Sequence, residues 1–135
     1  MDTTAMMRTM PTDAMPMTLD GEMVQDTMMT MNAASMAATM CSASDVRMGG
    51  EMATCAAMCA NTAMLADTAM RMLMRPEGMD AAAMRTVLEA CVAMGSACAA
   101  ECHRHAEMDE ACRYCAMACD EMVASCRTML DATTD

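Results

Sequence analysis

Sulfur-containing side chains recur near the C-terminus at the spacing of one face of a helix. They follow one another at alternating steps of four and three: Met108, Cys112, Cys115, Cys119, Met122, Cys126 and Met129. This is the spacing of the a and d positions of a helix that packs in a bundle. We therefore expect a helix whose whole buried face carries thiols and thioethers, which restricts the chain to folds with a sulfur-lined interior.

The preceding segment repeats this pattern. Its predicted buried face consists of Met84, Leu88, Cys91, Gly95, Cys98, Cys102 and His105, again at steps of four and three. Two such helices facing each other would line one interior with seven thiols. His105 continues this face, whereas His103 lies off it, so His105 is the better candidate for a ligand at the end of the bundle.

The sulfur pattern is less regular in the two earlier segments. One of them begins with Met48, Met52, Cys55 and Cys59 and then continues with an ordinary apolar face. In the other, Met29, Met36 and Met40 share a narrow arc at ~100° per residue, with Cys41 about a quarter turn away. We expect Met36 and Met40 to point inward.

The remaining pattern predicts an all-α protein. Residues after position 19 are rich in good helix formers, and Gly or Pro clusters only at residues 49–50 and 76–78. With one more break near residues 105–109, we expect helices over residues 20–43, 46–75, 79–105 and 108–131, with Asp45 and Asp80 as N-caps. Short connections favour an antiparallel up-down-up-down four-helix bundle over residues 19–135.

The first 18 residues lack a helical or alternating period and are predicted to be a mobile, Met-rich tail. Its methionines are Met1, Met6, Met7, Met10, Met15 and Met17. Two interpretations stay open: the tail captures a metal ion and passes it inward, or it is a leader without function.

Composition excludes several classes of function. The net charge is −11 with no Lys, so a nucleic-acid partner is not expected, and the apolar runs are too short to span a membrane. The chain carries 26 Met and 10 Cys but only one Tyr and no Phe or Trp. No arrangement of nucleophile, base and acid is evident, so we do not expect an enzyme.

Thiolate and thioether are soft ligands, and this chemistry suits Cu(I), which accepts two or three sulfur ligands. Cys55/Cys59, Cys98/Cys102 and Cys115/Cys119 are i, i+4 pairs, so each pair lies on one side of its helix. Cys112/Cys115 offers an i, i+3 variant. Thiolates facing one another across the bundle could bridge neighbouring ions, and the predicted cargo is several Cu(I) ions per chain.

Other interpretations stay open from the residues alone. Cys and Met also fill apolar cores, so a structural, Met-packed interaction module is one alternative. An iron–sulfur electron-transfer protein is another alternative, because the cysteine spacing in residues 112–119 is similar to that of iron–sulfur cluster ligands. Such ligands, however, usually lie on loops. Disulfides are disfavoured between cysteines on one helical face, and tetrahedral zinc would not explain the methionines.

Two segments carry a resemblance to a known family. EACVAMGSACAAECHRH (residues 89–105) and DEACRYCAMAC (residues 109–119) resemble the last two helices of the bacterial copper storage proteins. The resemblance extends over residues 41–131. It implies a four-helix bundle with interior Cu(I) sites on the seven cysteines of those helices, a histidine near one open end, and a homo-oligomer, often a tetramer of bundles.

The chain departs from that family where methionine replaces cysteine. Cys41 is the only cysteine of the first helix, and Leu65 and Ala69 stand where the family leads us to expect sulfur. Binding to a thioether releases no proton. We therefore predict a thiolate cluster between the second, third and fourth helices, flanked by weaker Met sites with nearly pH-independent affinity.

The predicted metal ligands comprise all ten cysteines, one histidine and eight methionines. They are Cys41, Cys55, Cys59, Cys91, Cys98, Cys102, Cys112, Cys115, Cys119, Cys126, His105, Met36, Met40, Met48, Met52, Met84, Met108, Met122 and Met129. Ten reduced thiols and a start at Met1 favour the cytoplasm, while the oxidation-tolerant Met ligands would also suit the periplasm. The copper donor and acceptor are not predicted.

Overall fold

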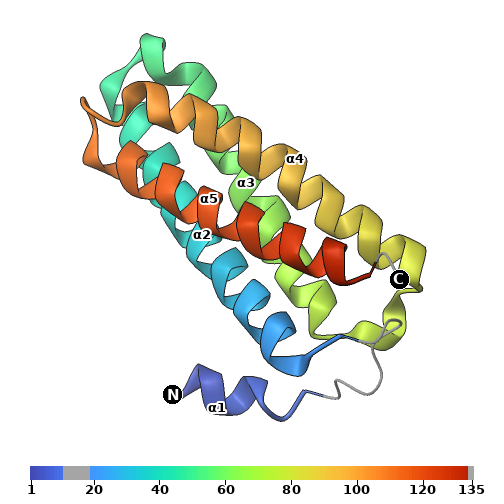
Figure 1. The fold of residues 1–135 in the computed structure, drawn as a ribbon. Coiled ribbons are helices and arrows are strands. Elements are labelled where there is room, and N and C mark those ends of the chain that lie inside the picture. The colour runs from blue at the N-terminus through green and yellow to red at the C-terminus, as the bar shows by residue number, and fades with distance from the viewer. Residues whose placement is uncertain (11–18, 134–135) are drawn as a thin grey trace.

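A computed structural model describes residues 1–10 and 19–133 of the chain (Figure 1). Four long helices make up most of it: α2 (Gly21–Met48), α3 (Ala53–Leu73), α4 (Ala81–His105) and α5 (Glu110–Ala132). A short helix, α1 (Thr3–Met7), precedes them, and two 3-10 helices, Gly50–Met52 and Pro76–Gly78, lie in the connections. The prediction of an all-α four-helix bundle is confirmed.

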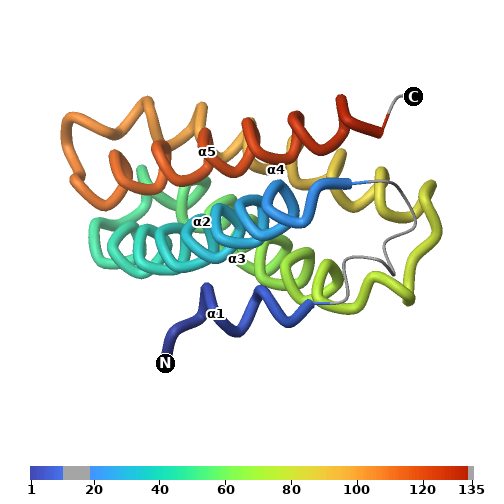
Figure 2. The backbone as a smooth tube through the Cα atoms, turned by 60° about the horizontal axis from the view of Figure 1, so that its bottom comes forward, coloured from blue at the N-terminus to red at the C-terminus, as the bar shows by residue number. Residues whose placement is uncertain are grey.

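Consecutive long helices run in opposite directions. In Figures 1 and 2 the chain passes along α2, returns along α3, passes again along α4 and returns along α5. The α2–α3 and α4–α5 connections therefore lie at one end of the bundle. The α3–α4 connection lies at the other end, where α1 also packs.

Aspartates begin three of the long helices. The side chains of Asp20, Asp80 and Asp109 accept hydrogen bonds from the backbone N–H groups of Glu22, Ala83 and Ala111 at 2.8–3.0 Å. Each bond satisfies a donor that the first turn of a helix leaves free. The predicted cap at Asp80 is confirmed, and α4 and α5 begin within two residues of their predicted starts.

The predicted boundary between the first two helices is wrong. Asp45 does not cap a second helix, because α2 continues through it to Met48 and the chain reverses at Gly49. Gly49 has φ 99°, a left-handed conformation that side chains with a Cβ rarely adopt, so the glycine determines where α2 ends. Asp45 is thereby placed inside the bundle and is fully buried.

The N-terminus also differs from the prediction. Residues 3–7 form α1 instead of an aperiodic tail, with Asp2 as its N-cap and Met7 buried against the bundle. The Gln25 side chain donates a hydrogen bond to the Met7 carbonyl oxygen at 3.5 Å. Residues 11–18 of the predicted tail lie outside the described residues.

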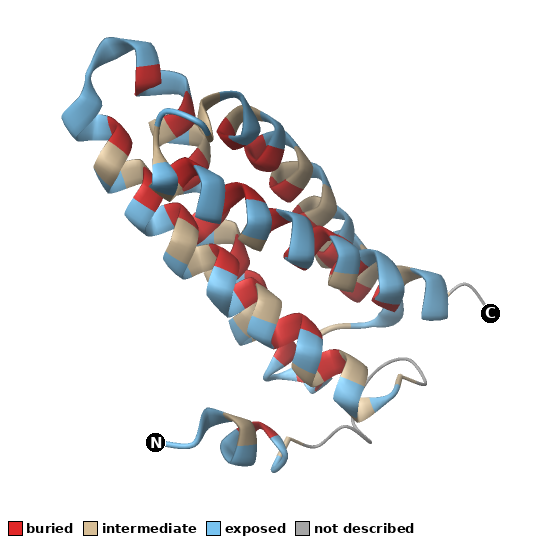
Figure 3. Cartoon of the chain, turned by 60° about the vertical axis from the view of Figure 1, so that its left-hand side comes forward, coloured by how far each residue is buried: buried red, intermediate tan, exposed pale blue. Residues whose placement is uncertain are grey.

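The core runs along the bundle axis and falls into two parts. Figure 3 shows buried residues on the inward faces of the long helices and exposed residues outside. The part near the α2–α3 and α4–α5 connections contains eight cysteines, and we call it the thiol half: Cys41, Cys55, Cys59, Cys98, Cys102, Cys112, Cys115 and Cys119. The other part contains Cys91 and Cys126 among Met, Leu, Val and Ala, and we call it the methionine half.

One described helix, α4, is long and apolar enough to cross a membrane by length and composition alone. Its Cys and Leu positions are nevertheless buried within the bundle. Core helices of bundles pass the same test, so this property of α4 does not indicate a membrane protein.

Candidate metal centre

Cys59 lies at the centre of the thiol half. Its Sγ is 3.5 Å from Sγ of Cys102, 3.7 Å from Cys98, 3.8 Å from Cys115 and 3.9 Å from Cys55. These partners come from α3, α4 and α5, so Cys59 connects three helices. The predicted convergence of thiols from the last three helices is therefore observed.

A second group of ligand atoms lies closer to the end of the bundle. Sγ of Cys112 is 3.4 Å from Sγ of Cys41 and 4.0 Å from Sγ of Cys55. The carboxylate of Asp45 contacts two of these cysteines. Its Oδ1 is 3.5 Å from Sγ of Cys112, and its Oδ2 is 3.7 Å from Sγ of Cys41. This group adds α2 to the other three helices.

The two regions are continuous. There are three overlapping sets of four ligand atoms. Within each set the atoms lie within 4.8 Å of one another, and every contributing residue is buried. The sets are Cys59/Cys98/Cys102/Cys115, Cys41/Cys55/Cys59/Cys102 and Cys41/Asp45/Cys55/Cys112. Because adjacent sets share Cys59 and Cys102 or Cys41 and Cys55, one thiolate can bridge two metal ions.

The spacing of the sulfur atoms suits bridging by a metal. All ten cysteines are free, and the Sγ–Sγ separations between neighbours in the thiol half, 3.4–4.0 Å, greatly exceed a disulfide bond of ~2.05 Å. Two metal–sulfur bonds of ~2.3 Å each span up to about 4.6 Å, so an ion fits between neighbouring sulfurs with a bent geometry. The thiols can therefore hold metal without large movement of the helices.

Most of these thiols stay protonated when no metal is bound, because hydrogen bonds between the thiols and burial together raise their pKa values. Desolvation, with a further contribution from Asp45, raises the pKa of Cys55 to about 12, and it also raises the pKa of Cys112. Hydrogen bonds from Cys102 and Cys115 instead lower the pKa values of Cys41 and Cys98, which favours the thiolate at both positions. Burial raises the pKa of Asp45 as well.

His105 lies near the α4–α5 connection, with a side chain that is only 13% exposed. Its Nε2 is 3.2 Å from Oε1 of Glu101, and its buried Nδ1 has no hydrogen-bond partner in the described part of the chain. His105 is not part of the three sets of ligand atoms. His103 is exposed and pairs with Asp120 at 2.9 Å, as its position off the buried face predicts.

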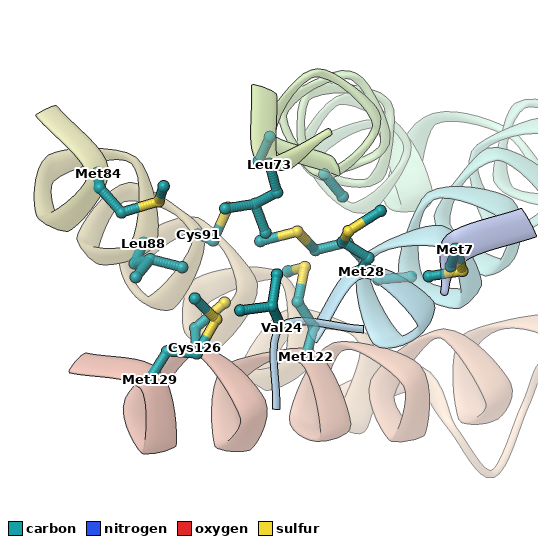
Figure 4. Close-up of a cluster of buried hydrophobic side chains, with 14 residues drawn as sticks. Met7, Val24, Met28, Leu73, Met84, Leu88, Cys91, Met122, Cys126 and Met129 are labelled. Atoms are coloured by element: carbon teal, nitrogen blue, oxygen red, sulfur yellow. The ribbon is translucent and has the colours of Figure 1, made fainter. Parts of the chain in front are cut away.

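The methionine half holds the other two cysteines. Hydrogen bonding between Cys91 and Cys126 lowers the pKa of Cys91 and raises that of Cys126, so they form a second, smaller thiol pair. Figure 4 shows Met84, Met122 and Met129 in the same cluster. These three predicted ligands are buried, as is Met52, which packs in the thiol half.

Four predicted methionine ligands do not face the interior. Met36, Met40, Met48 and Met108 are 50–67% exposed. Ala34, Ala38 and Cys41 occupy the inward face of α2, which turns Met36 and Met40 outward. Met48 is the last residue of α2, and Met108 precedes the N-cap of α5, so neither continues a helical face.

Sequence reasoning missed Asp45 as a residue of the site. It follows Cys41 by one helical turn, but that relation is visible only once α2 is known to extend to Met48. Asp109 was also missed, because its contact with the site depends on where α5 begins. It caps α5, and its Oδ2 lies 3.6 Å from Sγ of Cys112. The same oxygen accepts a hydrogen bond from Ser44.

Comparison with known families decides the assignment. Residues 17–131 match the family model described as copper storage protein. The chain belongs to the copper storage protein family. A comparison with curated protein sequences finds no significant match.

Solved structures agree with the copper storage assignment. A copper storage protein from Streptomyces lividans, Ccsp, loaded with 10 copper equivalents, has a TM-score of 0.86 and 30% identity, covering 93% of this chain and 95% of that one. A cytosolic copper storage protein from the same organism, loaded with five coppers, has a TM-score of 0.77 and 29% identity, covering 82% and 93%. The resemblance noted in the sequence is thereby confirmed, and the iron–sulfur alternative gains no support.

Proposed function

We propose that this protein stores several Cu(I) ions per chain as a cluster bridged by the thiolates of the thiol half. The observation that supports this most strongly is the overlap of three buried four-atom sets, which gives neighbouring ions shared ligands. Cu(I) is the soft monovalent ion for which such a ligand set is suited. Storage, sequestration and later release need no chemical transformation, so we propose no enzymatic activity.

Charge balance supports a monovalent cargo. A Cu(I) ion that replaces one thiol proton leaves the net charge of the buried cluster unchanged. A divalent ion would have to displace two thiol protons to leave the charge unchanged, and uncompensated charge in a buried site is costly. The thiol half can therefore take up one Cu(I) per displaced proton without accumulating charge.

Different residues have different proposed roles. Cys41 and Cys98, whose pKa values are lowered, are the thiolates that bind the first ions. Met52 flanks the cluster, and Cys91 and Cys126 form a separate site with Met84, Met122 and Met129 as weaker ligands. His105 offers Nδ1 at the end of the bundle.

Cellular context follows from the same family. We propose a cytosolic location, because ten free thiols need a reducing compartment and a relative is described as cytosolic.

We further propose a homo-oligomer, a tetramer of bundles, with no nucleic-acid or membrane partner. Light scattering coupled to size exclusion tests the oligomer, and a monomeric mass would exclude it.

The bridging cluster is tested by removing two pairs of buried thiols. Cys59→Ala/Cys102→Ala removes the thiols with the most neighbours, whereas Cys91→Ala/Cys126→Ala removes the isolated pair and serves as the matched control. Anaerobic Cu(I) titration against a competing chelator should show at least twice the loss of bound copper for the first variant. Circular dichroism checks that both fold.

Equal losses from the two variants would contradict bridging, because each thiol would then act alone. A wild-type chain that binds almost no Cu(I) would contradict the proposed function as a whole.

A further inference from the structure

A pocket of about 210 Å³ lies between α1, α2 and α3, outside the thiol half. Six of its eight lining residues are methionines, and the other two are a threonine and an asparagine. The methionines are Met6, Met7, Met28, Met29, Met70 and Met74. Nothing in the storage cluster described above uses this pocket.

The chemistry of the lining selects the type of ligand. Among the described residues, no carboxylate, imidazole or thiol lines the pocket, so hard cations and zinc would find few of their preferred ligands there. Thioethers are soft, neutral donors that suit Cu(I). A site built from them takes up the ion without releasing a proton.

The pocket is open on one side and closed on the other. Met6, Met29 and Met74 are 50%, 47% and 39% exposed, so they face the entrance. Met7 and Met28 form the inner wall, being 9% and 0% exposed. An ion can therefore enter from solvent and approach the more buried thioethers of the inner wall.

Packing alone does not explain this lining. A seam that served only to attach α1 would be filled by its side chains, whereas space for a ligand remains here. A five-residue helix is too short to be stable by itself, so α1 is held by its contacts. Those contacts include the buried Met7 and the hydrogen bond from Gln25.

The inner wall belongs to the core of the methionine half. Met7 and Met28 pack in the same buried cluster as Cys91 and Cys126 (Figure 4). Sulfur atoms therefore continue from the entrance of the pocket into the core. The pocket lies at the opposite end of the bundle from Asp45 and His105.

We propose that the methionines of α1, α2 and α3 form a thioether site that binds Cu(I) at the surface, separate from the thiolate cluster. The identity of the metal rests on the proposed function; the site itself rests on the pocket and its lining. Its affinity is lower than that of the thiolates, and it fills after they are saturated.

The test uses the full chain labelled with ¹³C at the methionine ε-methyl groups, kept reduced and without oxygen. Cu(I) is added as its acetonitrile complex, and absorption from thiolate-to-copper charge transfer reports filling of the cluster. After this absorption reaches its plateau, further Cu(I) should shift the methyl resonances of Met6, Met29 and Met74.

A matched pair of triple variants assigns the effect. Met6→Leu/Met29→Leu/Met74→Leu keeps the apolar volume but removes the sulfurs at the entrance. Met36→Leu/Met40→Leu/Met64→Leu changes three methionines elsewhere that are more exposed, at 59%, 67% and 63%. The pocket variant should lose about one Cu(I) equivalent beyond the plateau, the control variant none, and both should keep the same thiolate absorption.

Unmoved methyl resonances at the pocket, or equal losses from the two triple variants, would overturn the thioether site. Failure of the storage proposal gives a different result, the absence of any thiolate-to-copper absorption, so the two proposals fail separately.

Discussion

Asp45 is the least expected residue of the site. It is fully buried, and the partners of its two oxygens are the thiols of Cys41 and Cys112. Thiols are weak hydrogen-bond donors, so they compensate poorly for the lost hydration of a carboxylate. A buried carboxyl at this place is costly for the metal-free fold, which suggests that it is kept for its contact with the ligands.

Asp45→Asn should make the metal-free protein more stable near neutral pH. Burial raises the pKa of Asp45 above its value in the unfolded chain, so its stabilising contribution is complete below pH ~3.8 and is lost as the pH rises through the folded-state pKa. We expect a gain of about 1–2 kcal/mol in the free energy of unfolding near pH 7, and no gain below pH ~3.8. Urea denaturation under reducing conditions measures both.

Asp67→Asn is the control for this substitution. Asp67 is 41% exposed and pairs with Arg71 at 3.1 Å, so its replacement should change the stability by less than ~0.5 kcal/mol. A destabilised Asp45→Asn protein near neutral pH would show that the carboxylate is better accommodated than we infer.

At the level of single residues, the sequence predicted the thiols better than the methionines. The cysteines of α4 and α5 are buried as the spacing predicted, because the a and d positions of a bundle helix face the core and cysteine is a small apolar side chain. Met36 and Met40 were misplaced because methionine tolerates exposure, and the alanines that face inward on α2 gave no distinctive signal.

At the level of the helices, α4 and α5 approach each other closely at Gly95. Gly95 of α4 faces α5, and a Cβ built on it would lie 2.8 Å from Cγ2 of Val123 and 2.9 Å from Cε of Met122. Both distances are shorter than ordinary van der Waals contact. The absence of a side chain at Gly95 therefore sets the spacing of the two helices that carry most of the thiols.

Gly95→Ala should destabilise the protein despite the higher helix propensity of alanine. Overpacking costs ~1–3 kcal/mol and the gain in propensity is ~1 kcal/mol, so we expect a net loss of up to about 2 kcal/mol in thermal or urea unfolding. Gly78→Ala is the control, because no atom of residues 1–10 or 19–133 lies within 4 Å of its added Cβ. A more stable Gly95→Ala protein would mean that Met122 and Val123 move aside freely.

Helix boundaries were predictable where an aspartate cap and the hydrophobic pattern agreed. Asp80 begins α4 after a connection marked by Pro76 and Gly78, and the structure agrees with that prediction. Asp45 resembled a cap in the same way, but the Gly49 conformation decides the end of α2. The sequence alone does not show which of two nearby signals prevails, because the choice depends on burial in the folded bundle.

For the whole molecule, we expect the affinity for Cu(I) to depend on pH differently at thiolate and at thioether ligands. Burial raises the pKa of Cys55 to about 12, so its thiol must lose a proton when it binds copper. The affinity of the thiol half for Cu(I) should therefore rise with pH, by about one log unit per pH unit for each proton released per ion. Chelator competition near pH 6, 7 and 8, corrected for protonation of the chelator, measures the slope.

Copper bound only by thioethers should show no such slope, because methionine has no proton to lose. A flat profile for the ions that bind to Cys55 and the other thiols with raised pKa values would contradict binding by those thiols. The uneven division of sulfur along the bundle could be read from the sequence, since Cys41, Cys55 and Cys59 lie beside the connection between their helices. The pocket at α1 could not, because it depends on how residues 3–7 pack.

The distances across the thiol half also have a mechanical consequence. Cys59 and Cys102, or Cys41 and Cys112, lie on different helices, so an ion between them ties those helices together as a reversible cross-link. Binding in the thiol half would hold all four long helices together at that end of the bundle, whereas an ion at Cys91 and Cys126 would join only α4 and α5 in the methionine half. The copper content would then determine how rigid that end of the bundle is.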